Sequence, residues 1–303
     1  RRLGKSLGIN NIKRKICTYG CVYCQAGQTT CCTLERNCCL SPYELYFCVK
    51  SKINKLEKEK YKIDIVSYVP NGEPTLDNNL SKEIALLREF GYKIAVFTNG
   101  SLLWNDNVKE NLMFADYVSI KIDTGDELTW EKINRPHPRL RFEVMLKGIA
   151  DFSKLYRGVL TTETMLVKGV NDNIEEMEKI GELLKHIKCK KSYFTIPIRP
   201  PAKKGVMPPD KEVLQELSEY IKKYLPGSEM LCCPEIEDFR GTDNFESEFM
   251  AIVTVHPMRE DSVREYLSKK SIDWSVIEDM IKYHKIKETI YMNHKFYSLE
   301  TND

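Results

Sequence analysis

The sequence predicts an α/β fold, a partial TIM-type (β/α)6 barrel followed by a small winged-helix-like C-terminal domain. Short segments rich in β-branched and aromatic residues alternate with segments of helical spacing over about 200 residues. Such alternation implies crossover connections and a parallel sheet. Residues with unusual chemistry follow these strands, and the carboxyl ends of parallel strands are where α/β folds carry their sites.

Six strands are expected, each followed by a helix or a loop. The first is expected near residues 7–12, and the others at 63–69, 93–98, 116–122, 159–167 and 191–198. Helical spacing is found in segments 41–60, 79–90, 173–187 and 208–225. The earliest of these helices begins with Ser41 as a plausible N-cap and Pro42 at the first helical position.

The chain divides into three parts. We expect the barrel over residues 1–225, a linker or barrel-closing segment over 226–245, and the winged-helix-like domain over 246–303. The last part reads as three helices and a two-stranded wing. Its residues 257–303 carry eight Lys or Arg and nine Asp or Glu, a net charge of −1. DNA binding needs an excess of cations, so this domain is expected to dock a protein or cover a substrate instead.

Composition narrows the class of protein. Hydrophobic residues make up 42% and charged residues 30% of the 303 residues, and no apolar run approaches the roughly 20 residues that span a bilayer. The first ten residues lack the apolar core of a secretion signal, so we expect a cytoplasmic protein without a membrane partner. Its 11 cysteines should then be reduced and available for metal or redox chemistry.

Three cysteines, Cys17, Cys21 and Cys24, lie within eight residues of each other after the first strand. A zinc site would want a fourth ligand nearby, but no histidine precedes His137. A disulfide would leave one thiol over, and scattered structural thiols are the remaining alternative. Three thiolates can bind three irons of a [4Fe-4S] cube and leave the fourth iron open for a substrate or cosubstrate.

The spacing Cys-x3-Cys-x2-Cys, with Tyr23 before the last cysteine, resembles the radical S-adenosylmethionine (SAM) superfamily. The resemblance implies that SAM chelates the open iron through its amino and carboxylate groups. An electron from the reduced cluster then cleaves SAM to a 5'-deoxyadenosyl radical, which abstracts hydrogen from a substrate. A donor such as flavodoxin or ferredoxin would supply the electron.

The same resemblance implies the residues that bind SAM. Tyr23 is expected near adenine, and Gly72, Glu73 and Pro74 match a stretch that holds the SAM ammonium, with Asn71 in place of its first glycine. The other candidates are Ser119 and Asp123 for the ribose, Val167, Gly169, Val170 and Asn171 for adenine, and Arg135 and Arg199 for the SAM carboxylate or an anionic substrate. A turn is the alternative reading of Asp123, and a surface loop that of the arginines.

Several segments resemble a narrower group, often classed with the wyosine-base synthases that rebuild a guanosine in transfer RNA. These are RRLGKSLGIN, CVYCQ, GEPT, FTNGSLL, INRPH and VKGVND, spread over residues 1–240. Gln25 stands where those enzymes have Trp, and residues 1–16 contain no cysteine. The expected substrate is an RNA base or a peptide, and generation of a glycyl radical in another enzyme is a variant.

Eight further cysteines have no place in this site: Cys31, Cys32, Cys38, Cys39, Cys48, Cys189, Cys232 and Cys233. They could ligate a second iron-sulfur cluster or bind a thiophilic substrate. Against this, free cysteine is a common small core residue, and neighbours on a strand point to opposite faces. Two other classes stay open, an iron-sulfur regulatory protein and a metal-binding protein, neither of which cleaves SAM.

Overall fold

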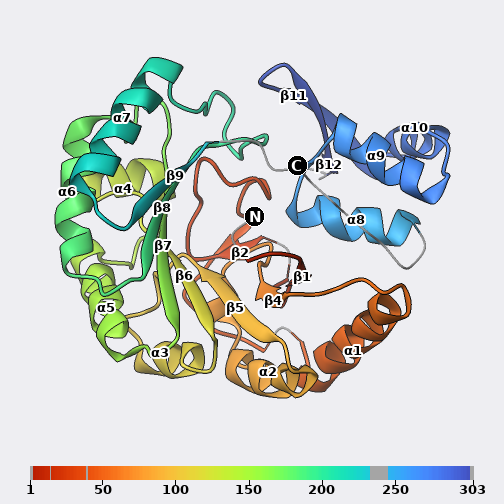
Figure 1. Ribbon diagram of the computed structural model, residues 1–303, viewed down its shortest axis with the longest axis horizontal. Coiled ribbons are helices and arrows are strands. Elements are labelled where there is room, and N and C mark those ends of the chain that lie inside the picture. Colours follow the sequence, from red (N-terminus) through yellow and green to blue (C-terminus); the bar gives the residue numbers. More distant parts are fainter. Residues whose placement is uncertain (1–2, 14, 39, 233–244, 301–303) are drawn as a thin grey trace.

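The computed structural model describes residues 3–13, 15–38, 40–232 and 245–300. Its centre is a curved, fully parallel sheet of seven strands in the order β1-β4-β5-β6-β7-β8-β9 (Figure 1). The strands are β1 (Ser6–Ile9), β4 (Ile65–Tyr68), β5 (Lys93–Thr98), β6 (Tyr117–Lys121), β7 (Val159–Met165), β8 (Lys191–Thr195) and β9 (Ser228–Leu231). This confirms the α/β class and the partial barrel. The seventh strand, β9, lies in the segment expected to link or close the barrel.

Helices cover the outer side of the sheet (Figure 1). Those expected from the sequence are α1 (Pro42–Lys58), α2 (Leu80–Leu87), α6 (Ile174–Lys185) and α7 (Lys211–Tyr224). The 3-10 helix η2 (Arg88–Phe90) continues α2, and a second 3-10 helix, η1 (Pro74–Leu76), was not expected. Alternate strand residues such as Val66, Val96 and Val118 are buried in one apolar core with the inner faces of the helices. Each strand therefore faces helices on one side only.

Three helices between β5 and β7 were not expected. They are α3 (Asp106–Leu112), α4 (Glu127–Asn134) and α5 (Phe142–Leu155). Asn105 and Asp126 cap the first two by accepting hydrogen bonds from the backbone N–H groups of Asn107 and Thr129. The first two helices are only 7 and 8 residues long, too short for a clear helical period in the sequence.

The C-terminal unit, residues 245–299, has its own apolar core. It contains α8 (Phe245–Val255), α9 (Glu260–Lys270) and α10 (Ser275–Lys282), followed by the hairpin of β11 (Ile286–Tyr291) and β12 (His294–Leu299). A short strand, β10 (Met258–Arg259), pairs with β12 and was not expected. The division of the chain into domains, and the likeness of the last one to a winged helix, stay predictions.

The C-terminal unit sits at the carboxyl edge of the barrel. Tyr291 donates a hydrogen bond to the carbonyl oxygens of Pro197 and Val206 at 3.3 Å each, and Glu248 forms an ion pair with Lys52 of α1. Within the described ranges, no helix is long and apolar enough to cross a membrane.

Candidate active site

The three clustered cysteines lie in one turn-rich segment at the carboxyl edge of the sheet. Cys17 ends the short strand β2 (Ile16–Cys17), and the Cys24 N–H donates to the Cys21 carbonyl at 3.1 Å. Each sulfur accepts from a different nitrogen: Asn99 Nδ2 to Cys17 Sγ at 3.6 Å, Asn134 Nδ2 to Cys21 Sγ at 3.4 Å, and Lys15 Nζ to Cys24 Sγ at 3.3 Å. The three donors come from the turn before β2, the loop after β5 and the end of α4.

The chemistry of these thiols fits an iron-sulfur cluster. Burial raises the pKa of Cys21 to about 12 and that of Cys17 further, so both stay protonated at neutral pH until a metal displaces the proton. Among the described residues, no three His, Cys, Asp or Glu side chains converge as ligands of a single metal ion. A [4Fe-4S] cube does not require three ligands on one metal ion, because each cysteine binds its own iron. N–H groups that donate to the sulfurs help to set the reduction potential of the cluster.

The loop after β4 is packed directly on the cysteine segment. A Cβ on Gly72 would lie 2.1 Å from the Ile16 carbonyl oxygen, so only glycine fits there. The Glu73 N–H donates to that same oxygen at 3.2 Å, and the Lys15 N–H donates to the Asn71 carbonyl at 2.8 Å. The Asn-Gly pair does not form a hairpin turn, because η1 follows it and β4 pairs in parallel with β5. The contacts to Ile16 and Lys15 fix Glu73 beside Cys17.

Glu73 is 1% exposed, and its two carboxylate oxygens are held unequally. Oε1 accepts from the Thr75 N–H at 3.1 Å and from the Thr75 and Thr98 hydroxyls at 2.6 Å each. Oε2 accepts only from the Asn99 N–H, at 2.8 Å, among the hydrogen bonds of the described residues. Burial raises the pKa of Glu73, and these four donors oppose that rise.

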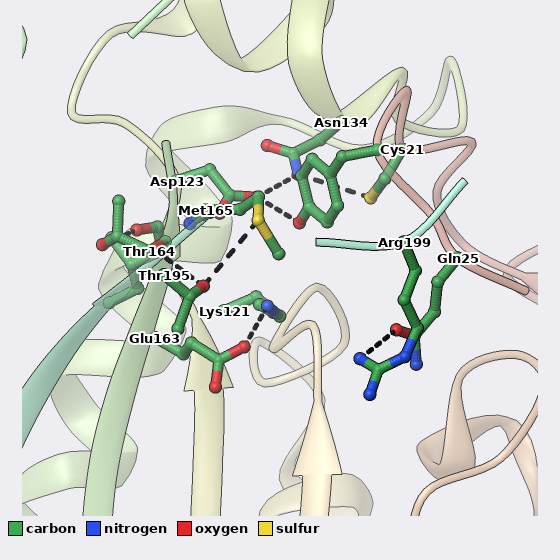
Figure 2. A network of polar contacts seen from close by, with 12 residues as sticks. Cys21, Gln25, Lys121, Asp123, Asn134, Glu163, Thr164, Met165, Thr195 and Arg199 are labelled. Carbon is green, nitrogen blue, oxygen red and sulfur yellow. Dashed lines mark hydrogen bonds and ion pairs between the residues drawn. The ribbon is translucent and has the colours of Figure 1, made fainter. Parts of the chain in front are cut away.

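A second buried carboxylate, Asp123, joins the cysteine segment to β6 and β7 (Figure 2). Its Oδ2 accepts from the Tyr23 hydroxyl at 2.5 Å and from Asn134 Nδ2 at 2.6 Å, while Oδ1 accepts from the Met165 N–H at 2.8 Å. Asn134 also donates to Cys21, so the network runs from one cysteine to the end of β6. Burial raises the pKa of Asp123.

The candidate adenine segment after β7 adjoins this network. Asn171 Nδ2 donates to the Asp123 carbonyl at 2.7 Å, and Asn171 Oδ1 accepts from the Val167 N–H at 2.8 Å. Gly169 has φ +67°, a conformation that favours glycine, and the Val170 N–H donates back to the Val167 carbonyl at 3.1 Å. Asn171 therefore holds a tight turn beside Asp123.

The remaining candidates differ in their relation to this site. Arg199 is 7% exposed and donates from Nη1 to Gln25 Oε1 at 3.3 Å, directly after Cys24 (Figure 2). Pro74 is buried at the start of η1, and Ser119 is buried within β6 between Phe97 and Thr161, away from these loops. Arg135 contributes backbone, because its carbonyl accepts from the Gly20 N–H at 3.0 Å.

Comparison with known proteins identifies the family. The profile of the Radical SAM superfamily matches residues 12–184, more than half of the chain. The protein belongs to the radical SAM superfamily. It is 40% identical over 299 residues to the UPF0026 protein MJ1312 of Methanocaldococcus jannaschii, and this match covers 98% of the chain and 92% of that relative.

Two solved structures share the fold of this radical SAM protein. A radical SAM methyltransferase from Sphaerobacter thermophilus has a TM-score of 0.60 at 16% identity, covering 78% of this chain and 67% of that one. A structure of TYW1 with a lysine-pyruvate adduct has a TM-score of 0.55 at 18% identity, covering 72% and 73%. The expected superfamily is therefore confirmed, and wyosine synthases are among the proteins of similar fold.

Several residues of this candidate site were not singled out from the sequence. They are Lys15, Asn99 and Asn134, which donate to the sulfurs, and Thr18, whose hydroxyl oxygen accepts from Asn99 and Ser101 at 2.7 Å each. Asn99 lies in the segment FTNGSLL and Asn134 in INRPH, so the sequence carried a signal for both. The contact of each asparagine with a cysteine sulfur joins residues more than 80 positions apart.

The other cysteines take scattered positions. Cys31 and Cys32 form the short strand β3 (Cys31–Cys32) and are exposed, as are Cys38 and Cys48. Cys189 and Cys232 are half-buried, while Cys39 and Cys233 lie outside the described residues. Cys32 is the register partner of Cys17. A second cluster stays a prediction.

Proposed function

We propose that this protein is a radical SAM enzyme that holds a [4Fe-4S] cluster on Cys17, Cys21 and Cys24. The observation that supports this is the arrangement of three sulfurs in one segment, each with its own N–H donor, packed against the loop of Glu73. When reduced, the bound cluster supplies the electron that cleaves SAM into methionine and a 5'-deoxyadenosyl radical, which abstracts hydrogen from substrate.

Glu73 would bind the SAM ammonium. A carboxylate oxygen has two lone pairs, and Oε2 uses one of them for the Asn99 N–H. The second can accept from an ammonium, whose positive charge would offset the cost of burying the carboxylate. Gly72 supports this role, because its missing side chain lets the loop approach the cysteine segment.

Tyr23, Asp123 and Asn171 would form the part of the site that binds the adenosine of SAM. Asp123 uses three of its four lone pairs within the network, where it positions Tyr23 and Asn134. One lone pair on Oδ1 would remain to accept from a ribose hydroxyl. Val167, Gly169 and Val170 would present backbone to adenine. Ser119, which lies within β6, would be a second residue near the ribose.

The substrate proposed from the sequence is an RNA base or a peptide, and the electron donor is a flavodoxin or ferredoxin. An iron-sulfur regulatory or metal-binding protein without SAM cleavage is the alternative. The buried polar network that joins the cysteine segment to Glu73 and Asp123 favours the enzyme, because binding iron alone does not need those two carboxylates.

The test is anaerobic reconstitution, followed by iron and sulfide counts and an assay of 5'-deoxyadenosine release from SAM after reduction. We expect about four irons per chain for one cube and release of the nucleoside. Cys21→Ala should abolish both, while Cys189→Ala, a half-buried cysteine outside the segment, should change neither. About eight irons would indicate a second cluster. Full nucleoside release by Cys21→Ala would exclude the assignment.

A further inference from the structure

Lys15, two residues before the first cysteine of the candidate site, is a buried lysine. It is 3% exposed, and its Nζ donates to Cys24 Sγ at 3.3 Å. Among the residues that the structure describes, no carboxylate forms an ion pair with this ammonium. A buried ammonium is costly unless a partner compensates its charge. The sulfur of Cys24 is therefore the partner that accounts for a lysine at this position.

Backbone contacts hold Lys15 in place on both sides. Its N–H donates to the Asn71 carbonyl at 2.8 Å, and its own carbonyl accepts from the N–H groups of Thr30 and Cys31 at 3.1 and 3.2 Å. Its φ of +56° lies in the left-handed region, which is unfavourable for a residue with a side chain. Contacts with two other segments keep this conformation, so the fold itself fixes the ammonium beside Cys24.

The other two sulfurs of the site have neutral donors. Each accepts from an asparagine that also donates to a buried carboxylate, in the series Cys17–Asn99–Glu73 and Cys21–Asn134–Asp123. An asparagine amide carries no net charge, whereas the lysine side chain brings a positive one. Two of the three sulfurs thus lie near buried acidic groups, and the third lies against a cation.

We propose that Lys15 is a positioning residue that acts through Cys24 to raise the reduction potential of the cluster held by the three cysteines. The inference rests on the proposed function. One electron enters the cluster from the external donor, and no bond forms or breaks at Lys15. The electron makes the cluster and its thiolates more negative, and a cation shielded from water stabilises that added charge. Local charge and hydrogen bonds to the sulfurs are among the factors that set such potentials.

Two other roles of Lys15 would leave this potential unchanged. A lysine that only supports packing would affect the stability of the chain with or without iron. A lysine that binds the SAM carboxylate would affect the affinity for SAM but not the potential measured without SAM. The potential of the cluster in the absence of SAM therefore separates the proposal from both roles.

The test is a redox titration of the reconstituted full chain without SAM, followed by electron paramagnetic resonance. Lys15→Met replaces the ammonium by an uncharged, unbranched side chain. We expect it to lower the equilibrium constant for reduction about tenfold or more, because a charged donor is lost, and tenfold is about 59 mV for a one-electron couple. Lys15→Gln should cause a similar fall, while Lys15→Arg, which keeps the charge, should retain most of the wild-type potential.

The matched control is Lys13→Met, which replaces an exposed lysine of the same segment. It should leave the potential unchanged, because solvent and salt screen an exposed charge. Equal potentials in the wild type and the uncharged Lys15 variants, or a fall of the same size in Lys13→Met, would overturn the proposal. Loss of the cluster from both uncharged Lys15 variants would also overturn it, because the cation would then be needed in either oxidation state.

Two further measurements keep the alternatives apart. A lower melting temperature of metal-free Lys15→Met with an unchanged potential would assign Lys15 a structural role, and weaker SAM binding with an unchanged potential would assign it to the SAM carboxylate. Iron and sulfide are counted first on the wild-type chain. A failure of the proposed function therefore appears in that count, whereas a failure of this inference appears only in the potentials.

Discussion

The cysteine segment with its surrounding loops and the C-terminal unit are built from different kinds of contact. Around the cysteines, buried side chains from the ends of β4, β5 and β6 bond directly to one another, as in the links from Glu73 to Asn99 and from Asp123 to Tyr23. The C-terminal unit has its own core, and among the described residues the contacts that join it to the barrel include hydrogen bonds and the ion pair between Glu248 and Lys52. The difference teaches that the candidate active site is shared among the ends of several strands, whereas the C-terminal unit is built around a core of its own.

Two buried glutamates test this contrast most strongly. Glu73 accepts four hydrogen bonds in the centre, and Glu248 pairs with Lys52 and Lys270 and accepts from Tyr266 in the C-terminal unit. Glu73→Ala should weaken SAM binding by roughly tenfold or more and lower the free energy of unfolding by about 2 kcal/mol, because buried donors lose their acceptor. Equilibrium binding and chemical denaturation measure the two effects.

Glu248→Ala is the comparison variant. It should lower the free energy of unfolding by about 1 kcal/mol, because the lysine partners of Glu248 are partly exposed and can be solvated by water instead. It should leave the affinity for SAM unchanged. Equal losses of SAM binding in the two variants would contradict the separation of the two regions.

Gly72 tests the same contrast through close packing of the backbone. Gly72→Ala would place a methyl group against the Ile16 carbonyl oxygen, and relief of that clash requires the loop to move, at a cost of about 1 to 3 kcal/mol. Iron content after reconstitution should fall along with SAM cleavage. Gly27→Ala, at φ +91° with open space around its Cβ position, should cost only about 1 kcal/mol and retain the cluster.

The pH dependence of stability tests a buried carboxyl group outside the candidate active site, that of Glu83 in α2. Burial first, and then Asp77, raises the pKa of Glu83 from 4.5 to about 8, with Tyr68 and Asn11 facing the same carboxyl. Between these values the folded chain keeps a proton that the unfolded chain releases. Stability should therefore fall as pH rises from about 4.5 to 8, by up to about 1.4 kcal/mol per pH unit.

Glu83→Gln should flatten that slope, as followed by denaturation at several pH values. Glu89→Gln, which alters an exposed carboxylate hydrogen-bonded to Tyr46, should leave it intact. A slope that persists in Glu83→Gln would assign the proton to another group.

The smallest expected effect is at the joint between the two regions. Asn71→Gly restores the glycine of the motif and removes the hydrogen bond to the Thr254 carbonyl. The free energy of unfolding should fall by about 1 kcal/mol. Hydrogen exchange should speed up in α8 and stay unchanged in β5 and β6. Iron content should not change. Faster exchange throughout the sheet would show that Asn71 supports the barrel and not the joint.

Much of this protein was predictable from local pattern. Strand and helix periods indicated the parallel sheet, and the positions of Cys17, Cys21, Cys24 and Glu73 after strands indicated one site, because parallel strands end at one edge. Short elements such as α3, α4 and β10 were not predicted, because a few residues do not complete a recognisable hydrophobic period. Residue type and spacing thus determined the superfamily and the candidate ligands.

Only the tertiary structure decided what these residues touch. Asn99 and Asn134 became donors to sulfur, Asp123 became the acceptor of Tyr23, and Asn71 and Gln25 became contacts of the C-terminal unit. Each of these contacts joins residues far apart in the chain. The physical reason is that a hydrogen bond depends on distance and direction in space, and those are set by how the strands and the C-terminal unit pack, which local sequence does not encode.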